Sequence, residues 1–385
     1  INFMLHGDST TIHKIYEQIV GQSCGLLIRD QNGNIIEKLG PEAIVSAGFD
    51  EDQSLFPYPD PSFSGYRLLS EYFSFPSKFM QFDLTGLESV SKSSNQHFEL
   101  IVLLAQEFEE LESKVDTKFF RMGYSPIVNL FEQIADPIRV DHRELEYRVI
   151  PDRRRGNMLT VYSVNKVQAL DQAGNELHLR PIHGYRHGDE VTDEIFWHIR
   201  RRSGFERNST TTDVWLSLID RTYKAAELLG STLTVHATCS NGELPGRLPF
   251  AQGANDFSME AGGPIAKICC LTKPSPPRPP QVRSSSRQDV LSHLSLNYLS
   301  LEQGGAKPFK AMLRLYGQGA GPAVMRKLDG LIDLKTQRVV RRVNRHGIAS
   351  FCQGLQFELV FNEEAYIGDG VFPFAELLER FLGLY

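Results

Sequence analysis

Apolar residues near the start of the chain first recur at helical spacing and then flank a turn. The run from Ile12 to Ile19 predicts a helix, with Thr10 or Thr11 as its N-terminal cap. The next two apolar runs surround the Asn-Gly dipeptide at 32–33, which is typical of a tight turn between antiparallel strands. The sequence therefore predicts a helix followed by a β-hairpin.

A proline-rich aromatic stretch at 56–63 precedes a second apolar stripe. The prolines of FPYPDPSF disfavour a helix or a central strand, so we expect a rigid extended loop. Tyr66, Leu69 and Phe73 then recur at helical spacing. They predict a helix that ends before Pro76.

Short apolar runs separated by Gly, Asn and Asp residues fill the middle of the chain. The run from Phe98 to Leu104 is almost continuously apolar, which predicts a fully buried strand. Val214, Leu216 and Leu218 alternate with polar residues, a pattern typical of a half-buried strand. Further strands are expected at 79–84, 145–150, 159–167, 177–182, 195–200 and 213–219. Many short strands of this kind indicate a sandwich or a partial barrel.

A linker rich in proline and serine, residues 273–286, precedes the last part of the chain. Apolar spacing after it predicts a helix at 288–301. In QGLQFELVF, alternate residues from Leu355 to Phe361 share one face, which predicts a strand. The chain closes with an apolar helical pattern that contains Leu378 and Phe381.

These elements predict an α+β, multi-domain, strand-rich fold with sandwich or partial-barrel-like domains and a few peripheral helices. A length of 385 residues suits two or three domains. We expect a strand, helix and hairpin domain at 1–84, ending in the aromatic loop and helix. A strand-rich middle domain at 85–270 and a linker plus α+β domain at 271–385 would follow. Because the chain starts at Ile1 and stops within a helical pattern, we expect a fragment of a longer protein.

Composition narrows the class of protein. The chain is 41% hydrophobic and 23% charged, as in ordinary globular proteins. A formal net charge of -6 disfavours a dedicated nucleic-acid binder. Five cysteines without a CxxC spacing predict reduced, buried thiols in a reducing compartment. No apolar run reaches the length of a membrane span, so we expect a cytoplasmic protein without membrane insertion.

Candidate metal ligands cluster around three histidines. His178, His183 and His187 lie close in sequence to several carboxylates. Gly184 and Gly188 indicate a solvated loop there, because glycine disfavours the helix that would align two histidines. A metal site is the alternative, since metal assignment depends on ligand number and geometry.

Other candidate chemistry also has a structural interpretation. The glycines of 317–322 do not match G-x-G-x-x-G, and the preceding segment is helical in pattern, so a turn is expected. Asp141 and His142 are adjacent, but no nucleophile elbow accompanies them. Cys269 and Cys270 lie in an apolar, strand-like stretch that predicts inert thiols. We expect no catalytic, cofactor or metal site, with a His/Asp hydrolase as an alternative.

Arginines form three clusters, at 153–155, at 200–202 and along the segment 338–345. The guanidinium group suits carboxylates because it presents five donors in a planar fork. Local salt bridges on a solvated face are the first interpretation. Docking to an acidic partner protein and binding to nucleic acid are the alternatives.

The aromatic segments suit either a core or a protein interface. Tyrosine, phenylalanine and arginine are enriched at interface centres, and a proline-framed loop loses little entropy on docking. The candidate partner-interface residues are Tyr66, Leu69, Tyr72, Phe73, Arg153, Arg154, Arg155, Arg278, Pro279, Leu378 and Phe381.

Several segments, taken in order, carry a family resemblance. They are FPYPDPSFSGYRLLSEYFSFPSKFMQFDL at 56–84, SPIVNLFEQIADPI at 125–138, DHRELEYRVIPDRRR at 141–155, VYSVNKV at 161–167, DVWLSLID at 213–220, TCSNGELPGRLP at 238–249, CLTKPSPPRPP at 270–280, SHLSLNYLSL at 292–301, TQRVVRRV at 336–343 and the closing VFPFAELLERFLGLY. Together they resemble the TssF family of type VI secretion baseplate proteins. The match is loose in QVRSSSRQDV and at 208–212, and members of the family are longer than this chain.

The resemblance implies a non-enzymatic structural subunit of the baseplate wedge. Its implied partners are TssG, a second TssF copy, TssK and TssE, arranged around the VgrG spike, together with sheath proteins. The resemblance also implies a role in nucleating the tail tube and sheath, at the inner face of the cell envelope. It implies no cofactor. A nucleic-acid-binding module that uses the arginine clusters is the main alternative.

Overall fold

The computed structural model describes residues 1–58, 62–88, 90, 97–141, 143–170, 174–182, 195–204, 212–220, 228–250, 255–260, 263–278, 305–345 and 348–384. The chain forms two compact units. Unit 1 combines residues 1–127 with 288–385, and unit 2 spans 128–287. The prediction of an α+β, strand-rich fold with several sheets is confirmed. The two units differ from the three consecutive segments that we predicted, because the two ends of the chain share one hydrophobic core.

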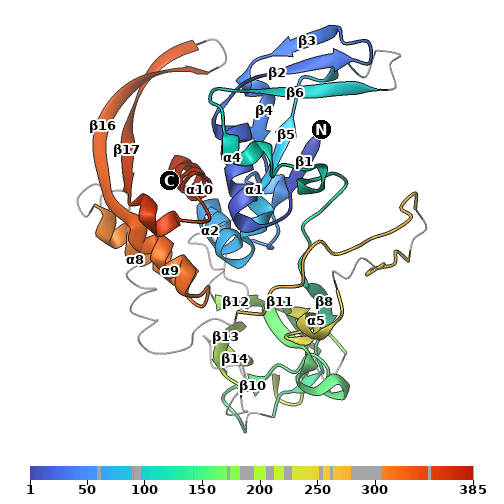
Figure 1. Cartoon of the computed structure of the whole chain (residues 1–385). Coiled ribbons are helices and arrows are strands. Elements are labelled where there is room, and N and C mark those ends of the chain that lie inside the picture. The colour runs from blue at the N-terminus through green and yellow to red at the C-terminus, as the bar shows by residue number, and fades with distance from the viewer. Residues whose placement is uncertain are drawn as a thin grey trace. The chain divides into compact units, whose positions relative to one another are not determined.

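Unit 1 packs its helices and three small sheets around that core (Figure 1). The sheets have the strand orders β4-β5-β1-β7, β3-β2-β6 and β16-β17. Their strands are β1 (Asn2–Leu5), β2 (Ser23–Asp30), β3 (Ile35–Leu39), β4 (Ile44–Ser46), β5 (Gln81–Leu84), β6 (Phe98–Leu104), β7 (Phe120–Arg121), β16 (Leu331–Arg345) and β17 (Ile348–Phe361). The α-helices are α1 (Ser9–Tyr16), α2 (Ser64–Ser74), α4 (Glu109–Glu112), α8 (Ala306–Gly317), α9 (Pro322–Gly330) and α10 (Phe372–Leu384).

The contact between α2 and α10 explains why the first and last segments fold together. Both helices present a continuous apolar stripe to the core, as their sequence spacing predicted. The rings of Tyr72 on α2 and Phe374 on α10 lie 5.9 Å apart, centroid to centroid. The Tyr16 hydroxyl also donates a buried hydrogen bond of 2.8 Å to Glu376 on α10. The packing of these two amphipathic helices against each other therefore joins the first and last segments of the chain in unit 1.

Local predictions in unit 1 are mostly confirmed, with two corrections. Asp30 accepts hydrogen bonds from the backbone of Asn32 and Asn34, both at 2.8 Å, and confirms the hairpin turn. The threonine cap was wrong, since α1 is capped by the Asp8 carboxylate, which accepts from the Thr11 backbone at 2.9 Å. The buried-strand prediction for β6 was also wrong. This strand lies at the edge of its sheet and exposes its two ends.

Unit 2 is built on an eight-stranded sheet with the order β10-β14-β13-β12-β11-β15-β8, to which β9 adds by pairing with β15. Its strands are β8 (Phe131–Ile134), β9 (Ile138–Arg139), β10 (Tyr147–Arg148), β11 (Thr160–Leu170), β12 (Glu176–Pro181), β13 (Ile195–Ser203), β14 (Thr212–Asp220) and β15 (Thr232–Ser240). The short helix α5 (Leu244–Arg247) follows. All five strands that we expected between 145 and 219 are present.

Strict alternation along β15 places one face of this sheet in the core. Leu233, Val235, Ala237 and Cys239 are at most 1% exposed, whereas the residues between them are half-buried. Two register irregularities interrupt the pairing of β11 with β15. Such irregularities increase the local twist of a strand. The sheet therefore curls around the core on its buried face, as in a partial barrel. The helix predicted at 288–301 lies outside the described residues.

Candidate assembly surfaces

Five of the predicted interface residues lie in the core of unit 1. Leu69, Leu378 and Phe381 are fully covered, and Tyr72 and Phe73 are 6% and 3% exposed. All five belong to one hydrophobic cluster, in which α2 packs against α10. The apolar stripes of α2 and α10 therefore stabilise unit 1 itself. This agrees with the interpretation that the aromatic segments pack in a core.

Tyr66 occupies the rim of this core. Its ring stacks on Tyr316 of α8 at a centroid distance of 5.9 Å and meets Phe63 edge-on at 5.0 Å. Phe63 also contacts Phe381 edge-on, at 5.8 Å. Tyr66 remains half-buried, so part of its ring is accessible. A docking role for Tyr66 stays a prediction.

A buried charge network fixes the chain in front of α2. Glu71 is fully buried and accepts hydrogen bonds from the backbone of Leu55 and Phe56, at 2.8 and 3.0 Å. Arg67, at 3.4 Å, and Lys78 form salt bridges with the same carboxylate. Burial lowers the pKa of Lys78. The network ties the start of the proline-rich aromatic segment to the helix that follows it.

The arginine turn at 153–155 is exposed in unit 2. The guanidinium of Arg153 lies 3.3 Å from Asp136, and that of Arg155 lies 3.4 Å from Asp152. The backbone N–H of Arg154 donates to the side chain of Asp152 at 2.8 Å. Because these pairs are exposed, each contributes little to stability. The turn keeps its positive charge at the surface, and its role as an interface stays a prediction.

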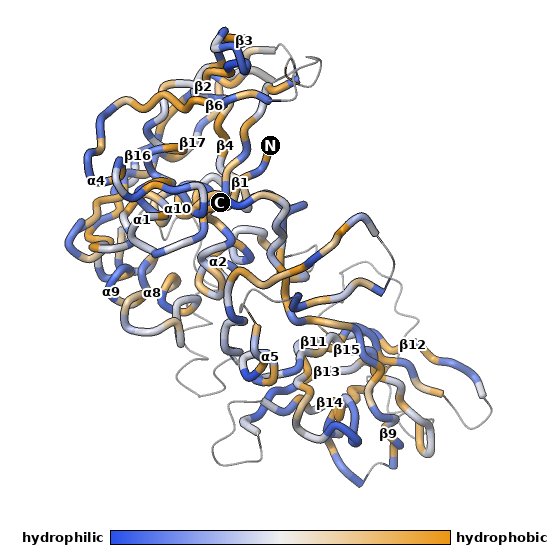
Figure 2. The backbone as a smooth tube through the Cα atoms, turned by 45° about the vertical axis from the view of Figure 1, so that its right-hand side comes forward, coloured by the Kyte–Doolittle hydropathy of each residue, from blue (hydrophilic) through white to orange (hydrophobic). Residues whose placement is uncertain are grey.

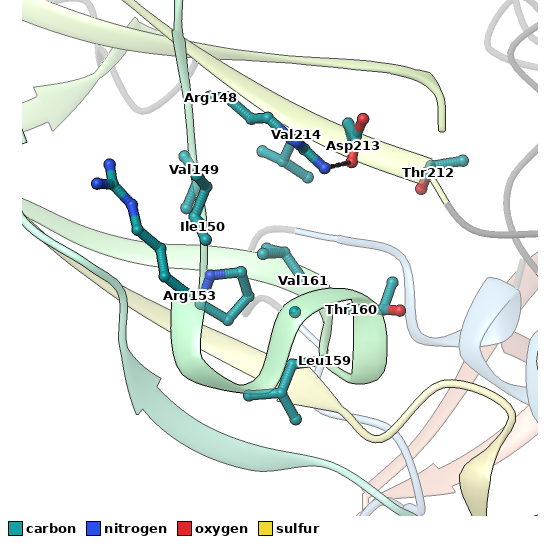
Figure 3. Close-up of a pocket in the computed structure, with 12 residues that line it drawn as sticks. Arg148, Val149, Ile150, Arg153, Leu159, Thr160, Val161, Thr212, Asp213 and Val214 are labelled. Carbon is teal, nitrogen blue, oxygen red and sulfur yellow. Dashed lines mark hydrogen bonds and ion pairs between the residues drawn. The ribbon is translucent and has the colours of Figure 1, made fainter. Parts of the chain in front are cut away.

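A pocket of about 210 Å³ lies beside this turn (Figure 3). One side is polar, where Arg148 pairs with Asp213 at 2.8 Å. The opposite side is formed by apolar residues that include Val161 and Leu159. The Thr160 hydroxyl is buried there without a hydrogen-bond partner among the described residues. The carboxylate in the described lining, Asp213, is engaged by Arg148.

The second arginine cluster is engaged within unit 2. Glu146 forms salt bridges with Arg202 and, at 3.6 Å, with Arg200. Arg201 donates to the Val161 carbonyl at 3.0 Å, and Arg202 also lies over the Trp215 ring. These contacts support the interpretation of local salt bridges and packing. In the prolyl segment, Arg278 is exposed, whereas Pro279 lies outside the described residues.

The other candidate chemistry does not converge on a site in the described residues. Asp141 and His178 are exposed, while His142, His183 and His187 lie outside the described residues. No group of three potential metal ligands occurs in the part of the chain that the structure describes. The segment 317–322 forms the turn between α8 and α9 that we expected.

The prediction of buried thiols holds for one cysteine. Cys239 is fully buried in unit 2, and burial raises its pKa to about 11. Cys24, Cys269 and Cys352 are exposed, and Cys270 is half-buried. The prediction was wrong for these four: Cys24 and Cys352 lie at exposed positions of β2 and β17, and the apolar residues beside Cys269 and Cys270 do not form a core strand.

The third arginine cluster lies on a feature that the sequence did not reveal. Strands β16 and β17 form a long bowed ribbon that begins next to α8 and α9 (Figure 1). Its base belongs to the core of unit 1 through Leu331 and Leu334. We call residues 336–343 and 350–357 the distal arm. Val340 and Phe351 on this arm are 61% and 77% exposed.

A second exposed apolar feature is the edge strand β6. Figure 2 shows the hydrophobic character of β6 and its neighbour β2. Phe98, Leu103 and Leu104 on β6 are 37–43% exposed. Long apolar edges are unusual in proteins that act alone, because their free backbone groups can pair with another chain.

Comparison with known proteins shows the family of the chain. The family model described as "Type VI secretion system, TssF" matches residues 1–385. The chain belongs to the TssF family. A curated relative, "Type VI secretion system component TssF1" of Pseudomonas aeruginosa PAO1, is 31% identical over 395 aligned residues. The alignment covers 99% of this chain, and the chain spans 64% of the length of that relative.

A solved structure extends the likeness of this TssF-family chain to its fold. It is described as the type VI secretion system TssK-TssF-TssG baseplate subcomplex revealed by cryo-electron microscopy. The match has a TM-score of 0.76 and 26% sequence identity, and it covers 100% of this chain and 69% of the other. The described residues contain no helix long and apolar enough to cross a bilayer.

The sequence pattern predicted no apolar contact residue on β6 or on the distal arm of this TssF-family chain. It identified the arginines of 338–345 but not Val340 or Phe351 beside them. The available signal was the alternation of TQRVVRRV, in which Arg338, Val340 and Arg342 fall on one face of a strand. That pattern could not show that β16 and β17 pair with no further strand among the described residues.

Proposed function

We propose that this chain is a structural part of a type VI secretion baseplate subunit that acts by assembling with TssG and TssK. The carrying observation is the whole-chain likeness to a chain of the TssK-TssF-TssG subcomplex, together with membership of the TssF family. The exposed apolar residues on β6 and the distal arm support this proposal, since such surfaces are typical of proteins that work in complexes.

The proposal extends to the wider machine. A second TssF copy, TssE, the VgrG spike and sheath proteins are further proposed partners, in a wedge that nucleates the tail tube and sheath. We infer a cytoplasmic position, docked at the envelope through the baseplate, and no catalytic role. Support for the last point comes from membership of the TssF family.

Co-expression tests the proposal. The full-length protein that contains this chain is produced with the TssG and TssK proteins of the same organism and purified through a tag on TssG. Native mass spectrometry then gives the composition of the complex. A stable complex that survives nuclease treatment is expected. Failure to co-purify would contradict the proposal. Release of the chain by nuclease would contradict it as well and would favour the nucleic-acid alternative.

A further inference from the structure

The distal arm is a two-stranded ribbon with one face of unusual composition. Strands β16 and β17 pair without interruption from Asp333–Val360 to Arg345–Ile348. Residues that pair directly across an antiparallel ribbon lie on the same face, and alternate residues along a strand share a face. Leu334 pairs with Leu359, and both pack in the core. The face that Leu334 defines can therefore be followed outward along the arm.

Beyond the core, this face combines arginine with exposed apolar residues. The next pairs on it are Thr336–Phe357, Arg338–Leu355, Val340–Gln353 and Arg342–Phe351. We call Arg338, Val340, Arg342, Phe351 and Leu355 the docking face. Phenylalanine and arginine are among the residues that dominate binding at interface centres. The apolar face of the core thus continues past the point where unit 1 covers it.

The opposite face, which we call the polar face, has two half-buried valines, Val339 and Val343, but its exposed side chains are mostly polar. Gln337 pairs with Gln356, and Arg341 pairs with Cys352 and donates to Gln356 at 3.3 Å. Arg341 and Arg342 are adjacent in sequence, yet the pairing register places them on opposite faces. They provide a matched pair of arginines for comparing the two faces.

Charge indicates the chemistry of what covers the docking face. The docking face carries two basic residues, Arg338 and Arg342, and the sequence has no Asp or Glu between Leu334 and Phe357. A basic, apolar face is complemented by apolar side chains flanked by carboxylates. A two-stranded ribbon without a further layer is marginally stable in water. The arm therefore gains stability when another element lies on this face.

We propose that the docking face receives an acidic amphipathic helix of a partner protein in the baseplate complex. This inference rests on the proposed function. A helix is favoured over an added strand, because edge pairing would leave Val340 and Phe351 exposed on the face. Arg338 and Arg342 are separated by about 13 Å along the strand. Carboxylates eight residues apart on one side of a helix are about 12 Å apart, which is close to that spacing.

Two charge reversals on the full-length protein test the docking face. Arg342→Glu alters the docking face, and Arg341→Glu makes the same change on the polar face. Affinity for the purified TssG–TssK pair is measured by biolayer interferometry, with unchanged melting temperatures required of both variants. We expect Arg342→Glu to weaken binding by about tenfold or more, and Arg341→Glu by less than about threefold. Equal effects of the two substitutions, or none, would overturn the proposal.

Photo-crosslinking identifies the occupant independently of affinity. Benzoylphenylalanine replaces Phe351 on the docking face or Ser350 on the polar face, in the co-purified complex. We expect efficient crosslinking from position 351 to a partner peptide with apolar and acidic residues at helical spacing, and little from position 350. Crosslinks to nucleic acid, to another segment of the same protein or to a non-acidic peptide would each overturn the proposal.

If the complex forms while the arm variants bind normally, the proposed function stands and this inference fails. If no complex forms with the unaltered protein, the proposed function itself fails.

Discussion

The charge network around Glu71 gives the sharpest test of how unit 1 holds its aromatic segment. Substitution of Glu71 by Gln removes the negative charge between Arg67 and Lys78, which are 4% and 1% exposed. Breaking a buried ion pair from one side leaves an uncompensated buried charge and typically costs about 3–5 kcal/mol. Here two cations would remain, and the backbone N–H groups of Leu55 and Phe56 would lose their charged acceptor.

The expected result is a large loss of thermal and chemical stability in the Glu71→Gln chain. A loss of about 3–5 kcal/mol lowers the melting temperature of a unit of this size by about 6–20 °C. Circular dichroism with heating and urea titration followed by fluorescence measure the change. A loss below about 1 kcal/mol would refute the reasoning, because a surface substitution gives a change of that size.

Lys78→Met serves as the matched comparison. It removes one of two cations and leaves Glu71 paired with Arg67, so it should cost less than Glu71→Gln. Glu110→Gln, which removes an exposed salt bridge to Lys14, should leave stability unchanged. A larger loss from Lys78→Met than from Glu71→Gln would contradict the view that the carboxylate organises the network.

The pH dependence of the Glu71→Gln chain follows from Lys78. Burial lowers the pKa of this lysine from its ordinary value of 10.5, so the unfolded chain binds the proton more tightly than the folded chain. Stability therefore rises with pH between the lowered pKa and 10.5. The hydrogen bond and charge of Glu71 raise this pKa, so Glu71→Gln lowers it further. The deficit of the variant should therefore narrow as the pH rises toward the Lys78 pKa of the unaltered chain, in urea titrations at a series of pH values.

Three further predictions concern the two cores. Tyr16→Phe removes the buried donor to Glu376 and should cost about 1–3 kcal/mol in urea unfolding; an unchanged midpoint would contradict it. Leu69→Ala in the core should cost about 2–5 kcal/mol, whereas Leu145→Ala at a 93% exposed position should be neutral; equal effects would favour a docking role for Leu69. Iodoacetamide should alkylate Cys24, Cys269 and Cys352 in the native chain but spare Cys239, as read by peptide mass mapping; rapid alkylation of Cys239 would show that the unit 2 core is open.

Local patterns predicted the elements well because the periodicity of a helix or strand depends on neighbouring residues. The stripes of α2 and α10 and the alternation of Leu355 to Phe361 are all present as expected. The same stripes did not reveal what covers them. The pattern of Leu69 and Phe381 suited the core first and a partner as the alternative, and the long-range contact between α2 and α10 distinguishes the two.

Exposure was the property that sequence could not supply. The run from Phe98 to Leu104 has the composition of a strand covered on both faces, yet it lies at the edge of a three-stranded sheet. The position of a strand within a sheet depends on segments far away in sequence, so the pattern cannot encode it. For the same reason the arginines of 338–345 were recognisable, whereas their division between two faces of an isolated ribbon required the pairing register.

Backbone hydrogen exchange, measured with and without the TssG–TssK pair, tests the central claim most directly. We propose that the chain is a scaffold: its aromatic helices stabilise it internally, and its distal arm binds a partner. Residues 64–74 and 372–384 should be protected already in the chain alone, and residues 350–357 should gain protection on assembly. New protection confined to α2 and α10, with the arm unchanged, would contradict the account.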